Sequence, residues 1–245
     1  MLHSPNLNII VKSLEKISAR LARDYTELEN LQMNNFSAVK FANSCFERIE
    51  ETLIAEFQKL RPNYNIRTIF GKKIEGVNGG EYQFVIAPID GLLNLSRSLS
   101  NFSSFVALEH IAADGKKEVI ASAILNVVSG EIFACEKGSS SFVNNRKIKV
   151  SKRELKDGIL CALGNPDLID HLLVKSLKNA KAVFQTSNCP SLDIANLASG
   201  KIDLAIFKSE DEGFLNPLLL IASEAGAKIE QKQGLILVKN EKINF

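Results

Sequence analysis

The sequence has little of what zinc enzymes and triad hydrolases use. It contains only three histidines, no two of them close together, and its four cysteines include no C-x-x-C pair. A zinc site or a Ser-His-Asp triad is therefore not expected. The scattered cysteines indicate reduced, mostly buried thiols.

Charge of one sign and long apolar runs are also missing. Thirty Lys and Arg residues against 28 Asp and Glu residues give a net charge of +2, which is too small to predict nucleic-acid or membrane binding. The densest basic segment, 146–153, is short and typical of a solvated face. No apolar run approaches the roughly 18 residues of a spanning helix, and the first residues do not resemble a signal peptide. We expect a cytoplasmic protein with no membrane partner and no direct nucleic-acid partner.

The hydrophobic period changes along the chain. Apolar residues spaced by three and four predict amphipathic helices over 7–31 and 37–60. From 66 to 150, short apolar runs predict strands, with a hairpin turn at Asn144-Asn145. Beyond Val150, strands alternate with helices expected over 167–177, 191–199 and 218–225. The pattern predicts a layered fold in which an N-terminal α+β subdomain (1–150) and a C-terminal α/β subdomain (151–245) form one compact unit.

One apolar run ends in a distinctive turn. Residues 84–89 lead directly into Asp90-Gly91, so a buried strand should present Asp90 at its C-terminal end. Asp90 could simply cap the helix that follows. Alternatively, backbone N–H groups after Gly91 could face a phosphate.

Four segments, in order, resemble motifs of the inositol monophosphatase family and its bacterial SuhB branch. Residues 84–94 are similar to D-P-I-D-G-T-x-N, and 132–151 to F-x-A-x-x-G-x-G-A-x-x-N-G…V-S. Residues 192–203 are similar to L-D-x-A-x-x-A-x-G-x-x-D, and 224–227 to E-A-G-G. The resemblance covers most of the chain and implies an α+β fold built as an αβαβα sandwich. It also implies a Mg²⁺-dependent phosphomonoesterase ancestry.

The same resemblance implies that much of the metal site is lost. The family's ligand carboxylates fall on Lys72, Ala87, Asp90 and Asn216, and only Asp90 keeps its carboxylate, with Ile89 retained beside it. Closely spaced Mg²⁺ ions need several hard, anionic oxygen ligands. We therefore expect no bound Mg²⁺ and a Lys72 ammonium near Asp90 in its place. A displaced carboxylate from Glu75 or Glu81 is the alternative.

The catalytic positions are altered as well. Leu92 and Asn43 stand where the family has its catalytic Thr and Asp, Lys40 replaces a second Thr, and Glu47 survives. The residues that the resemblance assigns to substrate or phosphate binding are Asp90, Gly91, Leu92 and Asp193. Asp193 could instead hold local backbone. The acidic run 210–212 lies near the family's substrate-binding Glu, but first-turn helix charges are an equally simple explanation.

Two functions follow from these observations. We expect a catalytically impaired family member with a binding or regulatory role. The SuhB branch implies a homodimer and a protein partner in transcription or ribosome assembly, contacted through the first helix or through 130–142. The alternative is an active Mg²⁺-dependent phosphatase of myo-inositol 1-phosphate or a similar phosphomonoester, with Asp90 as a ligand and Glu47 or Glu75 in displaced roles.

Overall fold

Two long helices form the outer layer of the chain, which this computed structural model describes over residues 4–179 and 181–243. Helix α1 (Pro5–Leu31) begins where the Ser4 hydroxyl accepts the Leu7 N–H, and α2 (Asn35–Leu60) begins where Asn34 accepts the Ser37 N–H. Most of the predicted apolar stripes are buried, whereas Val39 and Leu60 in the second stripe are each 38% exposed. Both predicted helices are confirmed, each starting two residues earlier than expected.

The first sheet has eight strands in the order β2-β1-β3-β4-β5-β6-β7-β8. Only the β1/β3 pair is parallel. Asn144 and Asn145 turn the β7–β8 hairpin at φ 45° and 65°, as predicted. The strands are β1 (Asn65–Thr68), β2 (Lys73–Ile74), β3 (Tyr82–Asp90), β4 (Ser103–Ile111), β5 (Lys117–Asn126), β6 (Glu131–Glu136), β7 (Phe142–Val143) and β8 (Arg146–Lys147).

The second sheet has five strands in the order β10-β9-β11-β13-β12, with β9, β10 and β11 parallel and the other pairs antiparallel. Its strands are β9 (Leu160–Leu163), β10 (Val183–Gln185), β11 (Leu204–Lys208), β12 (Lys228–Lys232) and β13 (Leu235–Lys239). The remaining helices are α3 (Leu92–Ser96), α4 (Leu172–Asn179), α5 (Pro190–Ala198) and α6 (Glu212–Glu224), with short 3-10 turns at Leu155–Asp157, Pro166–Asp170 and Ser209–Asp211.

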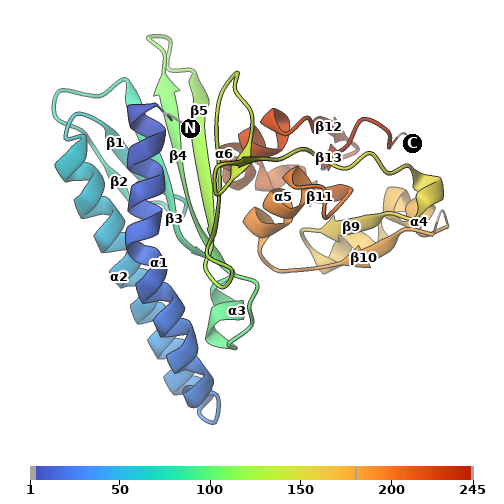
Figure 1. The fold of residues 1–245 in the computed structure, drawn as a ribbon, viewed down its shortest axis with the longest axis horizontal. Helices are drawn as coiled ribbons and strands as arrows, with labels where there is room; N and C mark the ends of the chain where they lie inside the picture. Colours follow the sequence, from blue (N-terminus) through green and yellow to red (C-terminus); the bar gives the residue numbers. More distant parts are fainter. Residues whose placement is uncertain (1–3, 180, 244–245) are drawn as a thin grey trace.

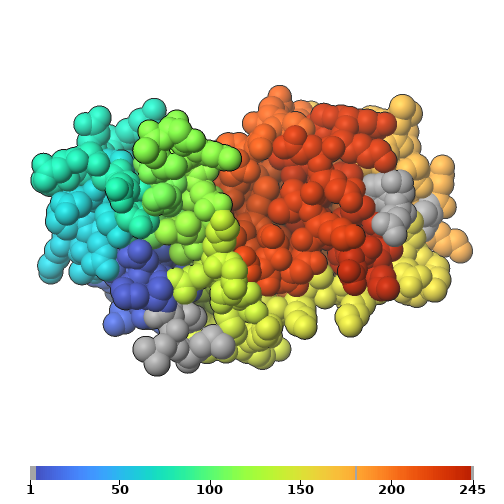
Figure 2. Space-filling model, turned by 90° about the horizontal axis from the view of Figure 1, so that it is seen from above, coloured from blue at the N-terminus to red at the C-terminus, as the bar shows by residue number. Residues whose placement is uncertain are grey.

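The layers follow from which apolar faces are buried together. Helices α1 and α2 cover one face of the first sheet, with the rings of Phe57 and Phe84 stacked 4.1 Å apart. Helices α5 and α6 fill the space between the two sheets, and α4 packs on the far face of the second sheet. The result is the predicted αβαβα sandwich (Figure 1). The early part of the chain occupies one end of the molecule and the late part the other (Figure 2).

Two predicted helices differ from the observed ones. The helix expected over 167–177 is a 3-10 turn followed by α4, because His171 adopts an extended ψ of 140° between them. Helix α6 begins six residues before the predicted start at 218 and carries Pro217 inside it. Proline ordinarily marks a helix boundary, but the fully buried Leu215 and Leu218 flank it and packing continues the helix through it.

Strand β3 lies inside the first sheet with both faces covered. Phe84 and Ile86 face the core under α1 and α2, whereas Ala87 faces the core that contains α5 and α6. This double burial explains the continuous apolar run at 84–89. No helix among the described residues is long and apolar enough to cross a membrane.

Candidate functional site

Strand β3 ends at Asp90 in an irregular turn. Its register against β4 shifts between Ala87 and Asp90. Gly91 follows at φ 80°, and a Cβ there would lie 2.7 Å from the Asn101 carbonyl oxygen, so both conformation and space require glycine. The turn places Asp90 against the start of α5, where the two halves of the chain meet.

The Asp90 carboxylate is already bonded to the N-terminus of α5. Its Oδ2 accepts the Ser191 N–H at 2.9 Å, the Ser191 hydroxyl at 2.5 Å and the Cys189 thiol at 3.4 Å. The Ser191 hydroxyl also shares a 2.5 Å hydrogen bond with Ser103. Cys189, the N-cap of α5, makes no side-chain cap bond. Asp90 therefore supplies the anion that this helix terminus favours.

This arrangement differs from the prediction that Asp90 caps the helix that follows it. The helix directly after Asp90 is α3, whose N-cap is Gly91 and has no side-chain cap. Asp90 instead caps a helix 101 residues later in the sequence. Sequence spacing could not reveal this partner, and Cys189 and Ser191 were missed as site residues because they carry no motif signal of their own.

Burial dominates the electrostatics around Asp90. Removal from water raises the pKa of Asp90, although the hydrogen bonds from Ser191 and Cys189 oppose that shift. Burial, followed by the adjacent Asp90 carboxylate, raises the pKa of the Cys189 thiol well above its usual range. Cys189 is therefore a protonated hydrogen-bond donor and not a nucleophile.

Asp193 is a second buried carboxylate, in the first turn of α5. Its Oδ2 accepts the Ser187 hydroxyl at 2.8 Å, and its Oδ1 is buried with no hydrogen-bond partner among the described residues. Burial raises the pKa of Asp193 to about 7, with the Asp90 charge adding to the shift. Ser187 also accepts the Cys189 N–H at 3.0 Å. Asp193 therefore holds the loop before α5, the structural role left open by the sequence.

Asn94 connects two loops at the same place. Its side-chain amide donates to the Asn101 carbonyl at 2.6 Å and to the Ser187 carbonyl at 2.8 Å. This ties the segment after Asp90 to the segment before α5. Asn94 was part of the quoted motif, but its bridging role depends on a partner 93 residues away.

A cavity of about 370 Å³ opens beside Asp90. Its floor contains Phe207 and Leu215, both almost fully buried, and Phe70, 64% exposed, stands at its mouth. A Cβ on Gly164 would lie 2.4 Å from the Phe207 ring, so this wall is closely packed. The other lining residues are Asp90, Asn165, Asn188, Pro190, Asp211 and Phe214.

The predicted contact between Lys72 and Asp90 is wrong. The Lys72 ammonium lies 3.4 Å from Glu50 on α2 and is half exposed, and no ion pair joins it to Asp90 among the described residues. Phe70, two residues earlier, reaches the cavity instead and meets Phe46 edge to face with centroids 5.1 Å apart. Glu75 and Glu81 are exposed, and neither lines the cavity.

The other expected metal positions are dispersed. Ala87 and Ile89 are fully buried in separate cores, and neither lines the cavity. Asn216 is exposed on α6, whereas Phe214 and Leu215 of the same helix line the cavity. Asn216 lies inside α6, which begins at Glu212. The part of this helix that lines the Asp90 cavity is therefore apolar.

The remaining predicted residues separate into a packed and an exposed group. Leu92 packs against the core under α1 and α2. On α2, Lys40, Asn43 and Glu47 are exposed and none of them lines the cavity. Within the acidic run 210–212, only Asp211 lines it. Among the described residues, no group of three or more His, Cys, Asp or Glu side chains is placed to hold a metal ion.

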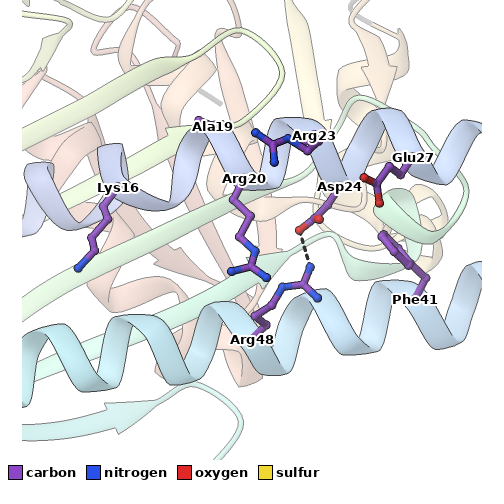
Figure 3. Close-up of a pocket in the computed structure, with 8 residues that line it drawn as sticks. All are labelled: Lys16, Ala19, Arg20, Arg23, Asp24, Glu27, Phe41 and Arg48. Carbon is purple, nitrogen blue, oxygen red and sulfur yellow. Dashed lines mark hydrogen bonds and ion pairs between the residues drawn. The ribbon is translucent and has the colours of Figure 1, made fainter.

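A second cavity, of about 520 Å³, lies between α1 and α2. Its lining residues lie far before Asp90 in the sequence. Figure 3 shows Arg20 and Arg48 extending toward each other across the gap between the helices, with Asp24 bonded to Arg48. That ion pair is 2.6 Å long. The Arg48 Nε is buried and has no partner within the described part of the chain. Phe41 supplies an apolar side to this otherwise charged groove.

Comparison with solved structures shows that this layered fold is shared with SuhB and inositol monophosphatase proteins. The SuhB extragenic suppressor protein of Bartonella henselae superposes with a TM-score of 0.81 at 24% identity, over 98% of this chain and 95% of that one. At that identity the likeness establishes the fold.

Sequence comparison establishes the family. The model of the inositol monophosphatase family matches residues 4–235, so the chain belongs to that family. The inositol-1-monophosphatase of Rhizobium meliloti is 26% identical over 209 residues, covering 83% of this chain and 76% of that protein. The Nus factor SuhB of Pseudomonas aeruginosa is 26% identical over 239 residues, covering 94% and 86%.

Proposed function

We propose that this chain is a catalytically impaired member of its family, kept as a binding or regulatory protein. One observation carries the proposal: the surviving carboxylate of the metal motif, Asp90, is used to cap α5. Three donors converge on its Oδ2, and the group is only 7% exposed. A metal ligand must present its oxygen lone pairs to the ion, and those of Oδ2 are directed at Ser191 and Cys189.

The surrounding residues do not fit Mg²⁺. The ion requires near-octahedral oxygen coordination and loses water reluctantly, so several carboxylates normally share it. The cavity offers Asp90 and Asp211, and Asp211 accepts the Lys208 N–H at 3.2 Å. The other polar side chains of the lining are the neutral amides of Asn165 and Asn188, and phenyl rings occupy much of the rest.

A phosphate dianion would need a positively charged partner in this cavity. None of its described lining residues is Lys, Arg or His. The N-terminus of α5, where an anion would otherwise bind, already holds Asp90. Binding a phosphomonoester beside two acidic side chains without a metal would be electrostatically unfavourable.

Phosphate release from myo-inositol 1-phosphate tests the proposal. The protein is assayed at high concentration with millimolar Mg²⁺, beside the Rhizobium meliloti inositol-1-monophosphatase as a positive control. We expect no release above that of the Asp90→Asn variant. Mg²⁺-dependent, Li⁺-sensitive release that Asp90→Asn abolishes would establish the alternative, an active phosphatase acting on this substrate or a similar phosphomonoester.

We propose that the protein binds a protein partner in transcription or ribosome assembly. Relatives carry the name Nus factor SuhB. The charged groove between α1 and α2 offers a contact surface on the outer helix layer (Figure 3). We also propose a homodimer, which sedimentation velocity would test: a species of about 27.0 kDa at micromolar concentration would contradict it.

A further inference from the structure

We propose that the cavity beside Asp90 binds a small organic cation: an ammonium group carried on an aromatic or similarly flat apolar body. The inference rests on the proposed function, since it assigns a ligand to the site that the metal has left. Three features of the cavity support it: its size, its aromatic walls and the sign of its charge.

The size suits a small organic molecule. A volume of about 370 Å³ lies within the roughly 300–1,000 Å³ typical of ligand sites. The floor is rigid, because Phe207 is packed on Gly164 and Leu215 is fully buried. Phe214 is held edge to face against Phe105, with centroids 5.6 Å apart. An apolar body entering here would replace water on apolar surfaces that are already fixed in position.

The walls suit a cation in particular. Phe70, Phe207 and Phe214 come from three separate segments and all line the cavity. The face of a phenyl ring is electronegative and attracts an ammonium group within about 6 Å. Such attraction is stronger where water is partly excluded, as it is above the buried floor of this cavity.

The charges of the lining residues also favour a cationic ligand. Asp90 and Asp211 line the cavity and no described lining residue is cationic. Asp211 lies in the 3-10 turn before α6, where its Oδ2 accepts the Lys208 N–H and leaves Oδ1 for a ligand. Asn165 and Asn188 add amide groups that can accept or donate. The charged side chains of this wall repel an anion and attract an ammonium group.

Isothermal titration calorimetry with three probes that share a phenyl ring tests the proposal: 2-phenylethylammonium chloride, 2-phenylethanol and phenyl phosphate with Mg²⁺. We expect the ammonium compound to bind with Kd below about 1 mM. The neutral alcohol should bind at least about threefold more weakly, the value of a partly exposed charge pair. Phenyl phosphate should not bind.

Variants locate the site. Asp211→Asn keeps an acceptor for Lys208 and should weaken 2-phenylethylammonium to the level of the alcohol. Glu210→Gln is the matched control, an exposed neighbour paired with Lys208 at 3.5 Å and outside the cavity lining, and it should leave affinity unchanged. Phe214→Leu should weaken both probes.

The outcomes distinguish failure of the cation site from failure of the proposed loss of catalysis. Equal affinity for the ammonium and the alcohol, or an unchanged Asp211→Asn variant, overturns the cation site. Binding of neither overturns it too, and leaves the proposed loss of catalysis standing. Saturable binding of phenyl phosphate with Mg²⁺ overturns both proposals together.

Discussion

The buried Asp193 carboxylate should make the protein less stable as pH rises from about 4 to about 7. Its pKa is 3.8 when unperturbed and about 7 in the fold, where burial disfavours the charged form. Between those values the folded state holds a proton that the unfolded state has released. The free energy of unfolding therefore falls as pH rises through this window and levels off above it.

The size of the effect follows from the shift. A change in pKa from 3.8 to about 7 corresponds to an effect on the order of 4 kcal/mol at about 1.4 kcal/mol per unit. The orphaned Oδ1 of Asp193 is consistent with this, since an unpartnered charged oxygen is costly to bury. Asp90 shifts in the same direction, so part of the dependence should persist without Asp193.

Urea unfolding of the wild type and of Asp193→Asn, at several pH values from 4.5 to 8, measures this. The asparagine variant retains an acceptor for Ser187 and cannot titrate. Its stability relative to the wild type should rise by several kcal/mol across the range. Asp114→Asn, an exposed carboxylate in a turn, is the control and should follow the wild type. Parallel stability curves for the wild type and Asp193→Asn would refute the assignment.

Three further changes test the same region by urea denaturation. Asp90→Ala should lower the free energy of unfolding by about 2–4 kcal/mol, because it removes the cap of α5 and leaves the Ser191 N–H and hydroxyl buried without that acceptor. A loss below about 0.5 kcal/mol, within the range of neutral surface changes, would show that the cap contributes nothing. Gly164→Ala should lower the free energy of unfolding by about 1–3 kcal/mol, since its Cβ would lie 2.4 Å from the Phe207 ring. An unchanged urea midpoint would contradict the close packing of that wall. Asn94→Ala should cost about 1–3 kcal/mol by releasing the carbonyls of Asn101 and Ser187, and wild-type stability would show that the loops are held otherwise.

Local patterns were sufficient for much of the fold. The apolar stripes of α1 and α2 and the apolar run of β3 each follow from spacing within one segment. Helix α6 began earlier than expected, because Pro217 conceals a helix that packing of Leu215 and Leu218 sustains. Propensity within a window cannot anticipate that tertiary contribution.

The candidate site depends on longer-range contacts. The motif located Asp90 and Gly91 correctly at the end of a strand, but not the partners of Asp90, which lie about 100 residues away. Lys72 was placed beside Asp90 by the motif resemblance, whereas it forms an ion pair with Glu50 and is half exposed. Asn216 was taken as a lost ligand position, but it lies exposed inside α6, which begins at Glu212. The aromatic wall gave no local signal, because Phe70, Phe207 and Phe214 meet only in the folded chain.

The central claim is that Asp90 serves α5 and no longer serves a metal. Calorimetric titration of the wild-type protein with Mg²⁺, and in parallel of Asp90→Asn, tests it most directly. We predict no saturable heat for either protein at micromolar to low-millimolar Mg²⁺. Saturable binding to the wild type at micromolar Mg²⁺, lost in Asp90→Asn, would contradict the account.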